Sequence, residues 1–253
     1  MPGAPVFTPT AASPQGVACA ASAGLVTRLG PGTLRRALRD AVATVLPVSC
    51  AGCGAPDRSV CAACRALATG RPTRLDRAGL AVWAALDYGG GVASLIGAFK
   101  DGGRTDAAPV LARALAGSLR AALGAAPRAP GDGLRVVTVP STPAAHRSRG
   151  YRPVPLLLDA CGIRADPILV LTRDRVDQAG LDAEARRVNA HGALQARERL
   201  DGRRFLLVDD VLTTGSTLLE ARRAIRTAGG SVAAIAVLAQ TPLRIDARSG
   251  SSR

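Results

Sequence analysis

The segment Phe205–Thr217, FLLVDDVLTTGST, joins an apolar run to two acids and a turn rich in hydroxyls. The run Phe205–Val208 is continuously apolar, which predicts a strand buried on both faces of a parallel sheet. Asp209 and Asp210 then stand at its carboxyl end, the edge at which open α/β sheets bind ligands. A helical pattern over 218–229 and a second apolar run follow. The segment therefore predicts a strand–loop–helix–strand unit with a ligand site between strand and helix.

The turn after the acids has the composition of an anion-binding loop. Gly215 permits a positive φ, so successive backbone N–H groups can converge on one anion, and the helix N-terminus adds partial positive charge. The candidate phosphate-binding residues are Thr213, Thr214, Gly215, Ser216 and Thr217. The loop has no lysine and no GxGxxG precedes it, which excludes the Walker A and dinucleotide motifs. With carboxylates beside it for a diol or Mg²⁺, the loop indicates a reader of ribose 5-phosphate. The alternative is a capped turn with two surface acids.

Upstream of this unit, strand and helix patterns alternate along the chain. Strands are predicted over 80–90, 134–140, 166–171, 205–208 and 231–239, and helices over 92–123 (with a break at 101–103), 154–162 and 218–229. Residues 64–79 have the pattern of a link. Alternating elements with continuously apolar strands favour an α/β fold whose parallel sheet is covered on both faces.

A second pattern is a cysteine cluster. It consists of Cys50, Cys53, Cys61 and Cys64, two Cys-x-x-Cys pairs separated by seven residues. Two such turns facing one another form a tetrahedral cage of four thiolates, which suits Zn²⁺. Because no secretory signal precedes the cluster, metal is favoured over a redox pair or disulfides. With four protein ligands the metal would be structural.

Composition leaves the class of partner open. The net charge of +14 and a pI near 11.2 are compatible with nucleic-acid binding, but the arginines are scattered, and Lys100 is the only lysine. An aromatic content of 2% argues against a base-stacking platform. No apolar run reaches the roughly 20 residues of a membrane span. Without a signal peptide, the expected location is the cytoplasm.

Three further groups of residues are candidates for substrate contacts. Arg147 and Arg149 follow a predicted strand and could bind pyrophosphate through their guanidinium forks, unless they only reflect the arginine-rich composition. Lys100 persists where arginine has replaced every other lysine, which suggests a compact ammonium near the anion site. The polar segment 173–189 is typical of a mobile loop or lid.

The segment Phe205–Thr217 resembles the phosphoribosyl pyrophosphate motif of type I phosphoribosyltransferases. Four further features, in chain order, resemble the competence-associated ComF family over about residues 46–240. They are the cysteine cluster, AFKDGGR (98–104), RSRGY (147–151) and DQAGLDAEARRVNAHGAL (177–194). The resemblance implies a type I phosphoribosyltransferase fold, with Asp209 and Asp210 on the ribose hydroxyls and Thr213–Thr217 on the 5-phosphate. It also makes Gln178, Arg186 and Asn189 candidate substrate-binding residues.

The sequence departs from the family patterns at three positions. Thr138 stands in the first loop where the family usually has Pro-Val-Pro, and Arg152 stands where it has Asn. Both departures leave the details of pyrophosphate binding open. Thr213 stands where oxopurine phosphoribosyltransferases carry an acid, so salvage of hypoxanthine or guanine is not expected.

The resulting expectation has four parts along the chain. These are a flexible leader with a short helix (1–45), a zinc module (46–72), a phosphoribosyltransferase-like domain (73–243) and a disordered tail (244–253). The expected ligand is Mg²⁺–phosphoribosyl pyrophosphate or ribose 5-phosphate, with Asp209, Asp210, Arg147 and Arg149 supporting transfer to an acceptor that the residues do not identify. The alternatives are a non-catalytic protein that handles single-stranded DNA, with competence proteins as partners, and a metabolite-responsive regulator.

Overall fold

The computed structural model describes residues 48–127, 133–172 and 192–242. The predicted leader and tail lie outside the described residues, as does the predicted lid with Gln178, Arg186 and Asn189.

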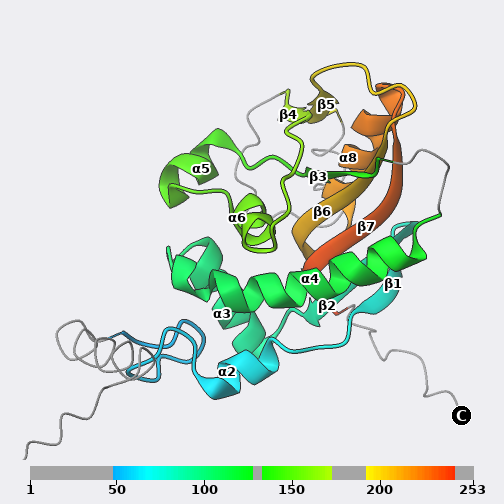
Figure 1. The fold of residues 1–253 in the computed structure, drawn as a ribbon. Coiled ribbons are helices and arrows are strands. Elements are labelled where there is room, and N and C mark those ends of the chain that lie inside the picture. Colours follow the sequence, from blue (N-terminus) through cyan, green and yellow to red (C-terminus); the bar gives the residue numbers. More distant parts are fainter. Residues whose placement is uncertain (1–47, 128–132, 173–191, 243–253) are drawn as a thin grey trace, which may run out of the picture. The chain divides into compact units, whose positions relative to one another are not determined.

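A five-stranded sheet organises the described chain (Figure 1). Its order is β1 (Thr73–Arg77), β2 (Leu80–Asp87), β7 (Ser231–Gln240), β6 (Arg204–Leu212) and β3 (Arg135–Thr138). Strands β2, β7, β6 and β3 are mutually parallel, whereas β1 pairs antiparallel with β2. The predicted α/β class is confirmed, with a sheet that is mixed but mostly parallel.

The predicted link over 64–79 is wrong. The chain there forms the end of helix α2 (Ala62–Leu67) and then strand β1, which returns as β2 through the two-residue turn Ala78-Gly79. Both turn residues have positive φ, 53° and 72°, the backbone conformation that matches the twist of a tight hairpin. An edge strand therefore lies where the sequence was expected to connect two domains.

The predicted strand over 166–171 exists but lies outside the main sheet. Strand β4 (Leu169–Leu171) pairs antiparallel with β5 (Leu194–Ala196), and in the described part of the chain an isolated backbone bridge joins Asp166 to Val137 on β3. Pro167 lacks the N–H that a central strand must donate, which limits how far this run can join the main ladder.

Strand β6 is longer than predicted. Its apolar start, Phe205–Val208, continues through both aspartates to Leu212, and β7 pairs with it along that length. The two acids therefore lie near the carboxyl end of the strand and not in the loop that follows it. This fixes their backbone more firmly than a loop position would.

Both faces of the sheet are buried, as continuously apolar strands require. Leu206 and Val208 belong to a core shared with helices α3 (Gly90–Lys100), α4 (Ala108–Ala125) and α6 (Pro153–Ala160). Phe205 and Leu207 belong to the opposite core, shared with α8 (Ser216–Thr227) and the antiparallel strand pair β4–β5. The predicted break between two helices at 101–103 is confirmed, with the short helix η1 (Thr105–Ala107) before α4.

The cysteine segment packs on the α3–α4 side of the sheet. Cys50, Val60 and Cys64 are buried in the same core as Leu95 and Leu111. Arg104 ties the segment down further, because its guanidinium donates to the carbonyl of Ser49 at 2.7 Å. Within the described residues, no helix is long and apolar enough to cross a membrane.

Candidate functional site

The two predicted acids lie half-buried near the end of strand β6. The backbone N–H of Asp210 donates to Asp209 Oδ1 at 2.9 Å, and that of Val211 donates to Asp210 Oδ1 at 2.6 Å. These bonds restrict the carboxylates while leaving further lone pairs for a ligand. Because β3 runs parallel to β6, the carboxyl end of β3 lies at the same edge of the sheet.

Lys100, at the end of α3, forms an ion pair with the second of these acids, Asp210. Its Nζ lies 2.7 Å from Asp210 Oδ2, and the two side chains are only 23% and 18% exposed. Burial lowers the pKa of Lys100, but the charges of Asp210 and Asp209 raise it by more, so the ammonium stays protonated well above neutral pH. The single lysine of the chain is therefore a fixed positive charge between α3 and β6.

The loop after β6 has the geometry expected of an anion-binding turn. Gly215 adopts a φ of 85° and caps α8, which begins at Ser216. The Thr214 hydroxyl donates to Ser216 Oγ at 3.1 Å, and the backbone N–H of Ser216 points to Thr214 Oγ1 at 3.4 Å. Among the described residues, no acceptor is found for the backbone N–H groups of Thr214 and Gly215. These donors are available to a ligand at the N-terminus of a helix.

The two candidate arginines on α5 (Pro143–Arg149) differ in their surroundings. Arg149 donates to Asp101 Oδ1 from both Nε, at 3.1 Å, and Nη2, at 2.8 Å. Its charge also acts on Lys100, so Arg149 belongs to the site's electrostatic surroundings. Arg147 is exposed, and the described residues offer it no hydrogen-bond or ion-pair partner.

Tyr151 helps to hold Arg149 near Lys100. Its hydroxyl donates to the carbonyl of Phe99, and the two rings lie 5.8 Å apart. Burial raises the pKa of Tyr151, which keeps the hydroxyl protonated and able to donate. The segment RSRGY and the end of α3 are therefore joined on both sides of Lys100, by Tyr151 to Phe99 and by Arg149 to Asp101.

Sequence reasoning missed Arg77, which lies under the loop. Its buried guanidinium donates to the carbonyl of Thr213 and to two acceptors at the end of β7. The signal that could have identified it is the tight turn Ala78-Gly79 between two strand-like runs, which indicates a hairpin rather than a link.

Sequence reasoning also missed Glu220 and Arg223 on α8, which form hydrogen bonds with the backbone of strand β5. Glu220 accepts the backbone N–H of Leu194 at 3.0 Å, and Arg223 donates to the carbonyl of the same residue at 2.8 Å. Burial raises the pKa of Glu220, but the hydrogen bond from Arg223 leads the contributions that bring it below its usual range. The helix that starts at the loop is thus fixed to the strand pair β4–β5.

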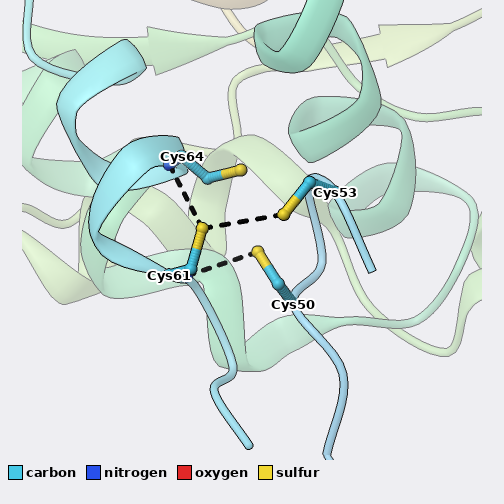
Figure 2. Close-up of side chains that lie close together, drawn as sticks. All are labelled: Cys50, Cys53, Cys61 and Cys64. Carbon is cyan, nitrogen blue, oxygen red and sulfur yellow. Dashed lines mark hydrogen bonds between the residues drawn. The ribbon is translucent and has the colours of Figure 1, made fainter. Parts of the chain in front are cut away.

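The four predicted cysteines come together in one cluster (Figure 2). Their sulfur atoms all lie within 4.8 Å of one another, and those of Cys53 and Cys61 are 3.6 Å apart. Zn–S bonds of about 2.3 Å in a tetrahedron separate the sulfurs by about 3.8 Å, so the cluster fits a metal ion of this kind. The backbone N–H of Cys61 also points to Cys50 Sγ at 3.3 Å, which helps to hold this sulfur in the cluster.

The thiols of the cluster differ in acidity. Burial raises the pKa of Cys50, but hydrogen bonds from the backbone of Cys61, Cys53 and Gly52 bring it down to about 6. Burial and hydrogen bonds with the other cysteines raise the pKa of Cys64 to about 12. Four sulfurs this close cannot all be thiolates unless a cation compensates their charge. The donor set is therefore consistent with a metal site of four thiolates.

Comparison with known protein families agrees with this geometry. The model of the phosphoribosyl transferase domain matches residues 163–250, a range that includes β6, the loop, α8 and β7. No curated protein matches the chain. The chain thus contains a phosphoribosyltransferase domain with a four-cysteine cluster N-terminal to it.

Proposed function

We propose that the chain binds Mg²⁺–phosphoribosyl pyrophosphate and transfers its ribosyl 5-phosphate group to an acceptor. The observation that carries the proposal is one continuous unit. Two half-buried acids near the end of β6 lead into a glycine loop at the start of α8, in which the N–H groups of Thr214 and Gly215 have no acceptor among the described residues. This unit lies inside the range matched by the phosphoribosyl transferase domain.

Each part of the unit has a role in holding the sugar phosphate. Asp209 and Asp210 accept hydrogen bonds from the ribose hydroxyls, because ionised carboxylates are acceptors only. The loop Thr213–Thr217 binds the 5-phosphate through backbone N–H groups and hydroxyls at a helix N-terminus. Lys100 compensates the charge of Asp210, so an anionic ligand can approach two adjacent carboxylates.

In the transfer, the bond from ribose C1 to the pyrophosphate oxygen breaks. The acceptor's nucleophilic atom bonds to C1, and the acceptor loses a proton. Lys100 and Arg149 are positive charges near the acids, and we assign them to the pyrophosphate, with the more exposed Arg147 as a further candidate. Mg²⁺, when bound, stabilises the charge on the leaving group, and Asp209 and Asp210 offer the oxygen ligands it prefers.

We assign the cysteine cluster to structural Zn²⁺. All four ligand positions come from the protein, which leaves none open for substrate. Cys50 and Cys64 are buried in the core that contains α3 residues. The bound metal would therefore stabilise the packing of α3, the helix that carries Lys100.

A second candidate function is motivated by the net charge of +14 and by the resemblance of several motifs to the ComF family. In this alternative the chain handles single-stranded DNA during competence, and the sugar-phosphate site acts as a sensor. Binding of single strands would then weaken steeply with salt and would not depend on Asp210.

An assay of pyrophosphate release separates the two candidates. Wild-type protein is incubated with Mg²⁺–phosphoribosyl pyrophosphate and a panel of nucleobases and amines as acceptors. The enzyme proposal expects release with at least one acceptor, and a loss of about 100-fold or more in Asp210→Asn, as for other groups that stabilise a transition state. Asp159→Asn, an exposed acid on α6, is the control and should keep wild-type turnover. Release that is unaffected by Asp210→Asn would contradict the proposed site.

A further inference from the structure

Arg77 is a buried arginine on the edge strand β1, beneath the loop that we assign to the 5-phosphate. The residue is only 8% exposed, although β1 lies at the edge of the sheet. Arginine is rarely this buried unless its charge or its fork of donors is needed.

The guanidinium of Arg77 joins the loop to the end of β7. Nη1 donates to the carbonyl of Thr213 at 2.5 Å, and Nη2 donates at 3.0 Å to both Gln240 Oε1 and the carbonyl of Thr241. Gln240 is itself fixed, because its amide donates to Asp87 on β2. The start of the loop is thereby fastened to three strands of the sheet.

The bond to Thr213 also determines how the loop presents its donors. In a trans peptide the C=O of one residue and the N–H of the next point in opposite directions. Since the Thr213 carbonyl points to Arg77, the N–H of Thr214 points away from it. That N–H has no acceptor among the described residues, so it is free to meet a ligand on the other side of the peptide.

The positive charge of Arg77 also favours the binding of an anion at this loop. All of its hydrogen-bond acceptors are carbonyl or amide oxygens, and within the described chain no carboxylate pairs with it directly. Its Nε is buried without any partner among the described residues. Burying a donor without a partner costs free energy, and an apolar side chain would fill the same space without that cost. A positive charge beside a phosphate loop, in contrast, attracts the phosphate.

We propose that Arg77 is the positioning residue of the 5-phosphate loop: it fixes the Thr213 carbonyl so that the Thr214 N–H faces the phosphate. This inference rests on the proposed function, because the ligand it names is the same sugar phosphate. It adds a residue that lies outside the range matched by the phosphoribosyl transferase domain.

The test compares Arg77→Met with Arg74→Met, which removes an exposed arginine from the same strand and so changes the net charge equally. Ribose 5-phosphate is titrated calorimetrically into each zinc-loaded protein. In parallel, hydrogen exchange is followed by mass spectrometry at two amides that are hydrogen-bonded to the ends of the loop, Leu219 to the Gly215 carbonyl and Thr241 to the Leu212 carbonyl, and, as a reference, in α4. Arg77→Lys keeps the charge without the planar fork and is measured in the same way.

We expect Arg77→Met to weaken ribose 5-phosphate binding at least about tenfold, the effect of losing a charge-assisted hydrogen bond. Exchange at Leu219 and Thr241 should accelerate while exchange in α4 stays at the wild-type rate, and Arg74→Met should match wild type in both measurements. The affinity and the loop exchange of Arg77→Lys should lie between those of Arg77→Met and wild type. If Arg77→Met does not fold, Arg77→Lys decides the outcome.

Two results would overturn the inference: unchanged affinity and loop exchange in the Arg77 variants, or faster exchange in α4 to the same degree as in the loop. The second result would mean that Arg77 only stabilises the fold. If wild type itself does not bind ribose 5-phosphate, the proposed function fails. The exchange comparison still decides whether Arg77 positions the loop.

Discussion

Lys100 Nζ lies 2.7 Å from Asp210 Oδ2, so the end of helix α3 meets the end of strand β6 at the proposed sugar-phosphate site. The contact pairs the only lysine of the chain with Asp210, one of two acids that are neighbours in the sequence. It also links the motif AFKDGGR to FLLVDDVLTTGST, two segments far apart in the sequence.

This contact predicts that Lys100→Met weakens binding of Mg²⁺–phosphoribosyl pyrophosphate by about tenfold, corresponding to about 1.4 kcal/mol. Without the ammonium, Asp210 presents an uncompensated negative charge to an anionic ligand. Lys100→Arg should restore only part of the affinity, because a planar guanidinium does not replace a compact ammonium in a partly buried pair. Calorimetric titration measures both, with the exposed Arg199→Met as control. Wild-type affinity in Lys100→Met would disprove this role.

Gly215→Ala should damage both stability and ligand binding. At a φ of 85° an alanine costs about 1–2 kcal/mol, whereas the nearest atom to its Cβ is 3.5 Å away, so backbone strain rather than a clash causes the loss. Gly202→Ala is the matched control, because it has a φ of 70°, open space around its Cβ and no place in the site. Urea unfolding should show similar losses in both variants, and only Gly215→Ala should lose affinity for ribose 5-phosphate. Equal affinities would argue against the loop as the phosphate site.

Glu220→Gln should lower the free energy of unfolding by about 1–3 kcal/mol at neutral pH, because a buried charged hydrogen bond to Arg223 is lost. The folded state lowers the pKa of Glu220, so the ionised carboxylate stabilises the protein above its unfolded pKa of about 4.3. That contribution disappears as pH falls through the lower, folded pKa. Urea unfolding from pH 7 down to pH 3 should therefore show the wild-type advantage shrinking.

The exposed Glu198→Gln, which pairs with Arg203, is the control for this series and should differ little from wild type at any pH. A constant difference between Glu220→Gln and wild type across the range would contradict the assignment to an ionised Glu220.

Cys50→Ser and Cys64→Ser should each lose the bound zinc, measured as metal per chain by mass spectrometry, and should unfold at lower temperature than wild type. The loss of stability is expected because both residues lie in the core shared with α3 and α4. Cys161→Ser, a cysteine outside the cluster, is the control and should retain zinc. Full zinc content in Cys64→Ser would rule out a site of four thiolates.

The parts of the fold that could be predicted are those that local sequence determines. Strand β6, the turn at Gly215 and helix α8 follow one another directly, so apolar pattern, glycine and hydroxyls were sufficient. The cysteine cluster was equally accessible, because its ligand spacing is local.

The parts that were missed depend on contacts between distant segments. Arg77 was placed in a link because the turn Ala78-Gly79 was not recognised as that of a hairpin, and the Thr213 carbonyl that Arg77 binds is far away in sequence. Strand β4 was assigned to the main sheet because its apolar run does not reveal which partner it pairs with, and β5 follows only after a long polar segment. Lys100 and Asp210 were both selected from sequence, but their contact required the tertiary structure.

The most direct test of the central claim is a calorimetric titration of zinc-loaded protein with Mg²⁺–phosphoribosyl pyrophosphate, beside the double variant Asp209→Ala/Asp210→Ala. The proposed site predicts saturable binding by wild type and no measurable binding by the double variant, whose circular dichroism spectrum should stay that of wild type. No binding by folded wild-type protein, or equal binding by both proteins, would contradict it.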